Sequence, residues 1–330
     1  MILPFKDVQY VYTNKCNLAS KTNYCSVPKN ITQKANIEDI KRVCDIFKKH
    51  NLQIKVLGGN PSDEDDFYQF IHYMNKIGID YVVTDNAINI EKLLAMDVNG
   101  VMFSLDTLGE SDIGGCSFIK SMKAKEAIAL YYNEFEYLGA NVVLNSKNLN
   151  EIENIIKFLT KHNAVANICP MITGHNDNFI FRIEEHRNSL EHAFPSDIKV
   201  AVEKLIEMKQ SGYKIGCPEE YLENLPNVIN PYRYNCRYNW DCSKITSIPI
   251  LRVNTDLSLM VCSDLVGSKI SEYNIFDIET KFNEINRAWL TDSQRETCCL
   301  RNGCYWSNIV ITDIYRKQRM GTLEATRRNL

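Results

Sequence analysis

The residues of this chain that could perform chemistry are its cysteines, which gather near the two ends of the sequence. Cys16 and Cys25 lie in the N-terminal segment YVYTNKCNLASKTNYCSV. The C-terminal third holds a second group, Cys236, Cys242, Cys262, Cys298, Cys299 and Cys304. Their neighbours include the Asn, Gly and Asp residues typical of loops, and thiolates are the preferred ligands of zinc and iron–sulfur sites. The pattern therefore favours metal chemistry over packing.

The state of these cysteines depends on the class of protein. Secreted disulfide scaffolds are usually short and carry a signal peptide. This chain has 330 residues, and its first segment, MILPFKDVQYVY, contains no basic region followed by a long apolar run. We therefore expect thiols or thiolate ligands in a cytoplasmic protein, with disulfides as the open alternative. Cys44, Cys116 and Cys169 stand apart from both groups and are expected to be small buried hydrophobic residues.

Composition and charge narrow the class further. The chain is 45% hydrophobic and 24% charged, which is typical of a globular domain. A net charge of −3 gives no overall positive field and argues against a nucleic acid partner. No run approaches the roughly 18 apolar residues that span a bilayer, so no membrane partner is expected.

The elements that would position the cysteines alternate between short apolar runs and amphipathic helical patterns. Strands are expected at 7–13, 52–57, 80–84, 100–105, 141–144 and 165–169, with a short one at 214–216. Helices are expected at 37–50, 63–76, 90–96, 118–138, 148–162 and 196–210. Strand–helix units in succession predict an α/β fold with a parallel sheet. Six such units are too few for a complete eight-unit barrel, so we expect a partial (β/α)6 TIM-like barrel.

Polar and glycine-containing segments follow the predicted strands, at the edge where parallel α/β folds place their chemistry. In chain order they are Thr13-Asn14-Lys15-Cys16, Gly58-Gly59-Asn60-Pro61, Thr84-Asp85-Asn86, Ser104-Leu105-Asp106 and Asn145-Ser146, and Pro170 follows the sixth strand. We expect these segments to meet at one edge of the sheet.

The pattern changes after about residue 216, where helical periodicity weakens and Cys, Asn, Tyr and Trp become frequent. Residues 250–254 and 257–261 predict a small hairpin around Thr255 and Asp256. Small irregular segments often need a metal to hold together. We therefore expect a barrel at 1–215 and a small Cys-rich α+β domain at 216–330.

In their order, these motifs resemble the radical S-adenosylmethionine (SAM) superfamily with a C-terminal auxiliary-cluster domain of the SPASM or Twitch kind. Cys16-Asn17-Leu18 and Tyr24-Cys25 are similar to the two ends of the family's cluster loop, and Gly58-Gly59-Asn60-Pro61 is similar to its Gly-Gly-Glu-Pro stretch. Residues 83–86, 103–106 and 148–152 resemble the family's third and fourth strand ends and the start of its fifth helix. The resemblance covers nearly the whole chain.

The resemblance implies a 4Fe–4S cluster and SAM at the carboxyl edge of the barrel. In the family, the thiolates of a C-x3-C-x2-C loop hold the cluster, which cleaves SAM to a 5′-deoxyadenosyl radical that abstracts hydrogen from substrate. Carried to this chain, it implies Cys16, Ser20 and Cys25 as cluster ligands. It implies Gly58, Gly59, Asn60, Ser104 and Asn145 as residues of the SAM site. It assigns no catalytic residue.

The chain departs from the family pattern twice at this site. Eight residues without a cysteine separate Cys16 from Cys25, and Ser20 stands where the middle thiolate belongs. Serine is a poor substitute because iron–sulfur clusters strongly favour thiolate. Asn60 replaces the glutamate that would hold the SAM ammonium, which removes a charge-assisted hydrogen bond. Three interpretations stay open: a cluster bound in a non-standard way, a fold kept after loss of the radical chemistry, and two ordinary thiols.

The C-terminal cysteines fit the SPASM/Twitch plan, in which one cysteine precedes a hairpin, one follows it and a later close pair completes the set. The ligands implied are Cys242, Cys262, Cys299 and Cys304, with Cys236 or Cys298 as substitutes for one of them. Leu257 stands where the pattern has a glycine, and the later pair is C-x4-C. Four thiolates equally suit tetrahedral zinc. We favour an auxiliary 4Fe–4S cluster because of the preceding domain.

The leading functional hypothesis is a radical SAM-type iron–sulfur enzyme that modifies a ribosomal peptide or a small metabolite and depends on a reducing electron donor. The substrate class rests on analogy at the level of the fold. The alternative is a catalytically degenerate protein that serves as a binding platform for a peptide or partner and keeps a structural Fe–S or zinc site. A third hypothesis is a zinc-stabilised barrel enzyme of unrelated chemistry.

Overall fold

A computed structural model describes residues 3–18, 33–111, 113, 115–170, 195–228, 247–261, 268–293 and 314. In these ranges the strands form one eight-stranded sheet in the order β6-β5-β4-β3-β2-β1-β7-β8. The strands are β1 (Asp7–Thr13), β2 (Gln53–Gly58), β3 (Tyr81–Asp85), β4 (Gly100–Ser104), β5 (Tyr137–Leu144), β6 (Val165–Pro170), β7 (Leu251–Val253) and β8 (Leu259–Met260). Neighbouring strands are parallel except β7 and β8, which are antiparallel.

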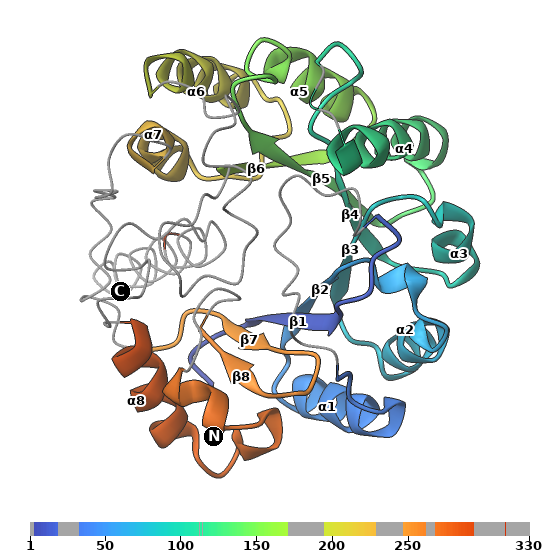
Figure 1. Ribbon diagram of the computed structural model, residues 1–330, viewed down its shortest axis with the longest axis vertical. Coiled ribbons are helices and arrows are strands. Elements are labelled where there is room, and N and C mark those ends of the chain that lie inside the picture. The colour runs from blue at the N-terminus through green and yellow to red at the C-terminus, as the bar shows by residue number, and fades with distance from the viewer. Residues whose placement is uncertain are drawn as a thin grey trace, which may run out of the picture.

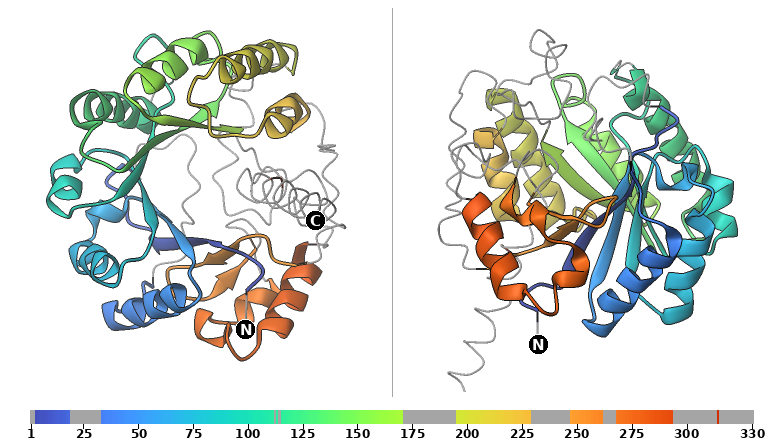
Figure 2. Two further views of the ribbon diagram at one scale, coloured as in Figure 1. Left: turned by 180° about the vertical axis from the view of Figure 1, so that it is seen from behind. Right: turned by 60° about the horizontal axis from the view of Figure 1, so that its bottom comes forward.

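Helices cover the outside of the curved sheet (Figure 1). In chain order they are α1 (Ile37–Lys49), α2 (Phe67–Ile77), α3 (Ile90–Ala95), α4 (Gly115–Tyr131), α5 (Ile152–Lys161), α6 (Pro195–Gln210), α7 (Glu219–Val228) and α8 (Phe282–Ser293). Single 3-10 turns form η2 (Pro61–Asp63), η4 (Lys269–Glu272) and η5 (Ile275–Asp277). The strands of the arc and their outer helices, seen from two further sides in Figure 2, confirm the predicted partial (β/α) barrel. No helix in the described ranges combines the length and apolar character needed to cross a bilayer.

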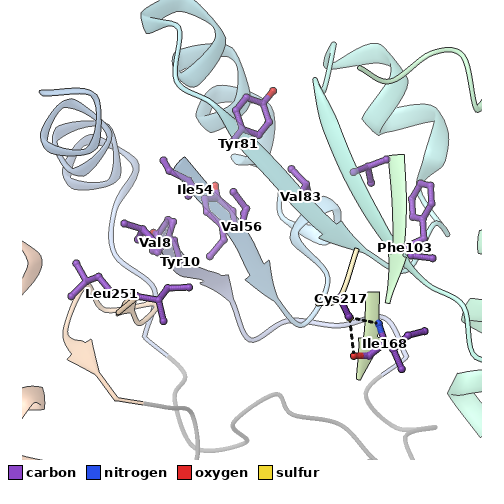
Figure 3. Packing of buried hydrophobic residues seen from close by; sticks show 14 of the residues in the cluster. Val8, Tyr10, Ile54, Val56, Tyr81, Val83, Phe103, Ile168, Cys217 and Leu251 are labelled. Atoms are coloured by element: carbon purple, nitrogen blue, oxygen red, sulfur yellow. Dashed lines mark hydrogen bonds between the residues drawn. The ribbon is translucent and has the colours of Figure 1, made fainter. Parts of the chain in front are cut away.

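The helices pack on the sheet because alternate side chains of each strand are apolar on the outer face (Figure 3). On β1 these are Val8, Tyr10 and Tyr12, all buried. Tyr12 stacks on Phe70 of α2 with ring centroids 4.7 Å apart. Among the isolated cysteines, Cys44 and Cys116 are buried as predicted, whereas Cys169 is partly exposed.

The predicted hairpin is confirmed, and it continues the barrel sheet. β7 pairs with β8 on one side and, in parallel, with β1 on the other, so that Val8 lies opposite Leu251 and Tyr10 opposite Val253. Apolar residues of this hairpin and of the barrel belong to one buried cluster. The division of the chain at residue 215 stays a prediction, and the two predicted parts share this sheet.

Several element boundaries differ from the predicted ones. α4 ends at Tyr131 and β5 begins at Tyr137, so the predicted helix 118–138 extends too far. The sequence between these two residues has no Gly or Pro to mark the change. α5 begins at Ile152, since residues 145–151 form turns. Residues 214–216 contribute one parallel bridge, between Ala166 and Ile215. α7 and α8 were not predicted, and α7 carries an internal Pro226 that hides its periodicity.

Candidate functional site

The ends of β1 and β2 approach each other closely through Gly58 and Gly59. A Cβ atom on Gly59 would lie 2.1 Å from the carbonyl oxygen of Lys15, and one on Gly58 would lie 2.4 Å from that of Thr13. Two backbone hydrogen bonds fix this approach, from Gly59 N to Thr13 O at 2.8 Å and from Asn60 N to Lys15 O at 2.7 Å. The glycine pair is therefore required by the chain segment that leads to the first cysteine of the predicted cluster loop.

Cys16 follows β1, and its side chain is partly exposed. The next residue is held at two points: Asn17 N donates to Asp63 Oδ2 at 2.7 Å, and Asn17 Oδ1 accepts from Asn86 Nδ2 at 2.8 Å. The other two predicted cluster ligands, Ser20 and Cys25, lie outside the described residues. The structure thus places one predicted ligand at the expected edge of the sheet.

Asn60, at the position of the family's glutamate, is fully buried. Its Nδ2 donates to Ser62 Oγ and to Asp63 Oδ1, both at 2.9 Å, and its Oδ1 accepts from Asn86 N at 3.0 Å. Three of the four hydrogen-bonding positions of the amide are therefore used inside the protein. The place of Asn60 in a SAM site stays a prediction. In the structure its side chain connects Ser62 and Asp63 to the backbone of Asn86.

Asp85 ends β3 as a buried carboxyl group beside this network. Its Oδ1 accepts from Ala87 N at 2.9 Å, and its Oδ2 from Ser62 N at 3.4 Å. Burial raises the pKa of Asp85 to about 6, because the hydrogen bonds from Ser62 and Ala87 offset only part of the desolvation and the nearby Asp63 charge adds to it. The group therefore titrates near neutral pH.

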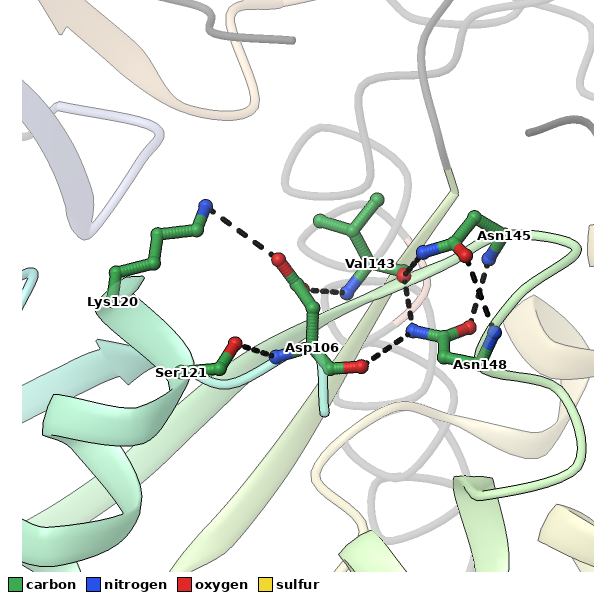
Figure 4. Close-up of polar contacts among 6 residues, drawn as sticks. All are labelled: Asp106, Lys120, Ser121, Val143, Asn145 and Asn148. Atoms are coloured by element: carbon green, nitrogen blue, oxygen red, sulfur yellow. Dashed lines mark hydrogen bonds and ion pairs between the residues drawn. The ribbon is translucent and has the colours of Figure 1, made fainter. Parts of the chain in front are cut away.

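A second polar cluster joins the ends of β4 and β5 (Figure 4). Asp106 Oδ1 accepts from Val143 N at 2.9 Å, and its Oδ2 lies 3.5 Å from the Lys120 ammonium. Asn148 Nδ2 donates to the carbonyl oxygens of Asp106 and Val143 at 3.0 and 2.8 Å. Asn145 N donates to Asn148 Oδ1 at 3.0 Å. These bonds fix the two strand ends relative to each other.

Asn145 and Ser104, both predicted for the SAM site, differ in availability. Asn145 is buried, and its Oδ1 accepts from the backbone N–H groups of Lys147 and Asn148 at 3.0 and 3.2 Å. Its Nδ2 donates to Val143 O at 3.0 Å. Ser104 is partly exposed, and its hydroxyl makes no hydrogen bond to another described residue. Among the polar side chains predicted for the SAM site, Ser104 is thus the available one.

Comparisons with known proteins agree with this arrangement. No model of a known protein family matches the chain. The chain is 25% identical over 304 residues to a probable GTP 3′,8-cyclase of Sulfurisphaera tokodaii, covering 86% of this chain and 90% of that protein. SuiB of Streptococcus suis bound to S-adenosylmethionine matches in structure with a TM-score of 0.60 at 16% identity, covering 84% of this chain and 66% of SuiB.

SuiB bound to its precursor peptide SuiA gives the same TM-score of 0.60 at 15% identity, covering 84% of this chain and 65% of that chain. The chain therefore spans about two thirds of the length of SuiB. The likeness to SuiB shows the fold, and the 25% identical relative adds a similarity in sequence.

The described residues fit a radical SAM site in part. The Cys16 thiol lies at the carboxyl edge of the sheet, and Ser104, at the end of β4, is partly exposed. The Asn60 amide, by contrast, is engaged with Ser62, Asp63 and Asn86 and leaves one hydrogen-bonding position for SAM. Of the three predicted N-terminal cluster ligands, Cys16 alone lies in the described part of the chain, and residue 60 carries an amide where the radical SAM pattern has a carboxylate.

The predicted auxiliary-cluster ligands, Cys242, Cys262, Cys299 and Cys304 with Cys236 and Cys298, lie outside the described residues. The hairpin between the first two is described, and its turn contains Leu257 at φ 68°. Leu257 N donates to Asn254 O, and Leu257 O accepts from Ile275 N, both at 3.0 Å. A left-handed backbone is uncommon for leucine and is readily adopted by glycine. Leu257, which stands where the SPASM/Twitch pattern has a glycine, thus has a backbone conformation that suits glycine.

Cys217 is a buried thiol that sequence reasoning did not single out. Its Sγ lies 3.4 Å from Asn167 Oδ1 and accepts from Ile168 N at 3.2 Å. Burial raises the pKa of this thiol to about 12. Cys169 Sγ lies 3.5 Å from Nδ2 of the same Asn167. The one sequence signal that could have placed Cys217 near β6 was the short strand pattern at 214–216, because Ile215 pairs with Ala166.

Proposed function

We propose that this chain is a radical SAM enzyme that binds a 4Fe–4S cluster and SAM at the carboxyl edge of β1–β5 and modifies a peptide or a small metabolite. The observation that carries the proposal is the position of Cys16, which follows β1, a strand with parallel neighbours on both sides, at the edge where such folds place their chemistry. The fold of SAM-bound SuiB and the similarity to a probable GTP 3′,8-cyclase support it.

The residues of this chain would take distinct tasks at that site. Cys16 would hold one iron through its thiolate, with Ser20 and Cys25 as the further proposed ligands. Gly58 and Gly59 let the chain before Cys16 pack against the end of β2. Ser104 would offer its hydroxyl to SAM from the inner face of β4. When bound, the cluster and SAM would supply a 5′-deoxyadenosyl radical that abstracts hydrogen from the substrate.

The inner face of the sheet supports a substrate that carries an anionic group. Lys55, Gln9 and Arg252 occupy in-register positions on β2, β1 and β7. They alternate with outward-facing apolar residues, so all three side chains lie on the inner face. Lys55 and Arg252 thus lie on the two strands that flank β1, and two cationic side chains on one face favour a phosphate or carboxylate group. The probable GTP 3′,8-cyclase is named for a triphosphate and SuiB binds a peptide, and this charge favours an anionic metabolite or an acidic segment of peptide.

For the C-terminal part we propose an auxiliary 4Fe–4S cluster on Cys242, Cys262, Cys299 and Cys304, with zinc as the alternative metal. The left-handed backbone at Leu257 supports this, because it retains the shape of the glycine turn of the SPASM/Twitch pattern. A reducing electron donor is a further proposed partner, since the cluster must be reduced before it can act.

A binding platform without radical chemistry is the second candidate, and the Asn60 geometry favours it. Asn60 carries no charge, and its buried amide is occupied by Ser62, Asp63 and Asn86. The loss of a carboxylate at this point weakens any grip on an ammonium group. Such a platform would keep the barrel and the C-terminal metal and would not cleave SAM.

The deciding experiment is carried out on protein reconstituted without oxygen with iron and sulfide. SAM and dithionite are added, and 5′-deoxyadenosine is measured for the wild type, Cys16→Ala and Cys169→Ala. Cys169 is the matched control because it is a partly exposed thiol at the end of β6. Product that is lost in Cys16→Ala and kept in Cys169→Ala supports the enzyme.

Absence of product, with about four irons per chain, supports the platform with a C-terminal cluster alone. Zinc without acid-labile sulfide supports a zinc-stabilised barrel. Either result overturns the proposed radical chemistry.

A further inference from the structure

Asp63 is the centre of a hydrogen-bond network that joins the ends of β1, β2 and β3. Its Oδ2 accepts from Asn17 N at 2.7 Å. Its Oδ1 accepts from Asn60 Nδ2 at 2.9 Å and from Asn89 Nδ2 at 2.7 Å. One carboxylate therefore receives three N–H groups, each from a different segment or position of the chain.

The same short segment, 60–63, holds the chain on both sides of Cys16. Before Cys16, the carbonyl oxygen of Lys15 accepts from Asn60 N at 2.7 Å. After Cys16, Asn17 N donates to Asp63 at 2.7 Å. The peptide groups on both sides of Cys16 are thus bonded to η2 and to its N-cap residue Asn60, and this fixes the path of the chain through Cys16.

Asn60 and Asn86 brace this clamp. Asn60 bridges the Asp63 carboxylate and the backbone N–H of Asn86 through the two ends of its amide. Asn86 in turn donates from Nδ2 to Asn17 Oδ1 at 2.8 Å, which closes a ring of hydrogen bonds. Each member of the ring is a short amide or carboxylate, and each bond runs between residues that are adjacent at the carboxyl edge.

We propose that Asp63 is the positioning residue of Cys16, and that Asn60 serves as a strut of this clamp in place of a contact to SAM. The proposal rests on the proposed function, because it concerns how the thiol is presented to a cluster. Asp63 suits the task because a carboxylate accepts at both oxygens, and its charge strengthens each bond. An asparagine at residue 63 would turn one acceptor into an NH2 group facing N–H donors.

The test uses the metal-free full-length protein under reducing conditions, so it does not depend on cluster chemistry. The alkylation rate of Cys16 by iodoacetamide is followed by peptide mass spectrometry in the wild type and Asp63→Asn. Loss of the clamp should increase the rate about tenfold, since local opening exposes the thiol. Asp65→Asn is the matched control, because Asp65 is an exposed carboxylate two residues further along the chain. It should leave the rate unchanged.

The buried Cys44 reports on global unfolding in the same samples, since its alkylation requires the core to open. A faster Cys16 with an unchanged Cys44 supports the positioning role. Equal Cys16 rates in the wild type and Asp63→Asn overturn it. If Asp63→Asn does not fold, Asn89→Ala removes one donor to Asp63 without touching Asn17 and should give a smaller increase. An unchanged rate in that variant also overturns the proposal.

A second readout separates this inference from the proposed function. After reconstitution with iron and sulfide, Asp63→Asn should lose part of the iron that Cys16→Ala also loses. If the wild type and Cys16→Ala bind equal iron, the proposed N-terminal cluster fails while the alkylation result still decides the role of Asp63. In the other case, Cys16→Ala loses iron, but Asp63→Asn binds as much iron as the wild type and its Cys16 is alkylated at an unchanged rate. That result overturns the positioning role of Asp63 and leaves the proposed N-terminal cluster standing.

Discussion

At the scale of the residue, Leu257 shows a conflict between backbone preference and burial. The residue adopts φ 68° although its side chain is buried. A left-handed backbone costs a side-chain-bearing residue about 1–2 kcal/mol, whereas burial of a leucine side chain contributes about 1.5–3 kcal/mol. The apolar contacts of the leucine therefore outweigh the strain, and leucine is tolerated at a glycine position.

This balance predicts an unusual order of stability at residue 257. Leu257→Ala should lower the free energy of unfolding by about 2–3 kcal/mol, since it keeps the strain and loses the packing. Leu257→Gly should be more stable than Leu257→Ala by about 1 kcal/mol, because glycine adopts this backbone freely. Urea unfolding of both variants measures the difference. An alanine variant more stable than the glycine variant would contradict the argument.

Asp85 predicts a dependence of stability on pH. Its pKa is raised to about 6 in the folded protein from the ordinary 3.8, so between these values the folded state binds a proton that the unfolded state has lost. The contribution is fully present below about pH 4 and is lost as the pH rises through 6, a fall of about 3 kcal/mol. Urea unfolding from pH 4 to 8 should show this fall in the wild type and lack it in Asp85→Asn. Equal pH profiles would exclude Asp85 as its source.

Sequence reasoning located the site residues better than it assigned their roles. Cys16, Asn60 and Ser104 were expected at the carboxyl edge because parallel strands end there together, and the structure places them there. The role of Asn60 depends on Asp63 and on the backbone of Asn86. Such partners come from neighbouring loops, and a strand-end position alone does not reveal whether an amide faces a ligand or its own protein.

At the scale of the element, the loop between β5 and α5 depends on Asn148. This buried side chain bonds the carbonyl oxygens of Asp106 and Val143 and the N–H of Asn145 (Figure 4). Asn148→Ala should lower the free energy of unfolding by about 2–4 kcal/mol, because it leaves buried backbone groups without partners. The exposed Asn154→Ala serves as a control and should change it by less than about 0.5 kcal/mol. Urea unfolding distinguishes the two, and equal small effects would contradict the assigned role.

The elements were predictable where the apolar residues followed one regular helical or strand spacing. They were not predictable where a helical pattern ran directly into a strand pattern. α1 carries apolar residues on one face and an Asn36 N-cap, so its start was confirmed. The change from α4 to β5 has no Gly or Pro, and the helical pattern therefore extended past Tyr131. α7 and α8 were missed because Pro226 and the frequent polar residues obscured their apolar faces.

At the scale of the whole molecule, the hairpin and the barrel should unfold together. Their apolar residues share one buried cluster, and β7 pairs with β1. All three tryptophans, Trp240, Trp289 and Trp306, lie after residue 216. Tryptophan fluorescence therefore reports on the C-terminal part, while far-UV circular dichroism reports mainly on the barrel helices. We expect coincident urea transitions, and two separated transitions would indicate independent domains at the predicted boundary.

The cationic residues inside the barrel predict binding of small anions. Lys55→Gln should weaken the binding of inorganic tripolyphosphate about fivefold at low salt, because it removes one of the two cationic side chains, Lys55 and Arg252, that flank Gln9. Lys76→Gln is the control, since Lys76 is an exposed lysine on α2. Isothermal titration calorimetry measures both. Equal weakening by the two variants would mean that only the overall charge matters.

The place of β1 between β2 and β7 also affects how the protein emerges from the ribosome. β1 can pair with β2 soon after both are synthesised. Its opposite edge pairs with Leu251–Val253, which are synthesised after most of the chain. At about 5–20 residues per second, that edge stays uncovered for on the order of tens of seconds during translation. An apolar strand with one open edge is a template for wrong pairing, so we expect the nascent chain to depend on chaperones until residue 253 has been made.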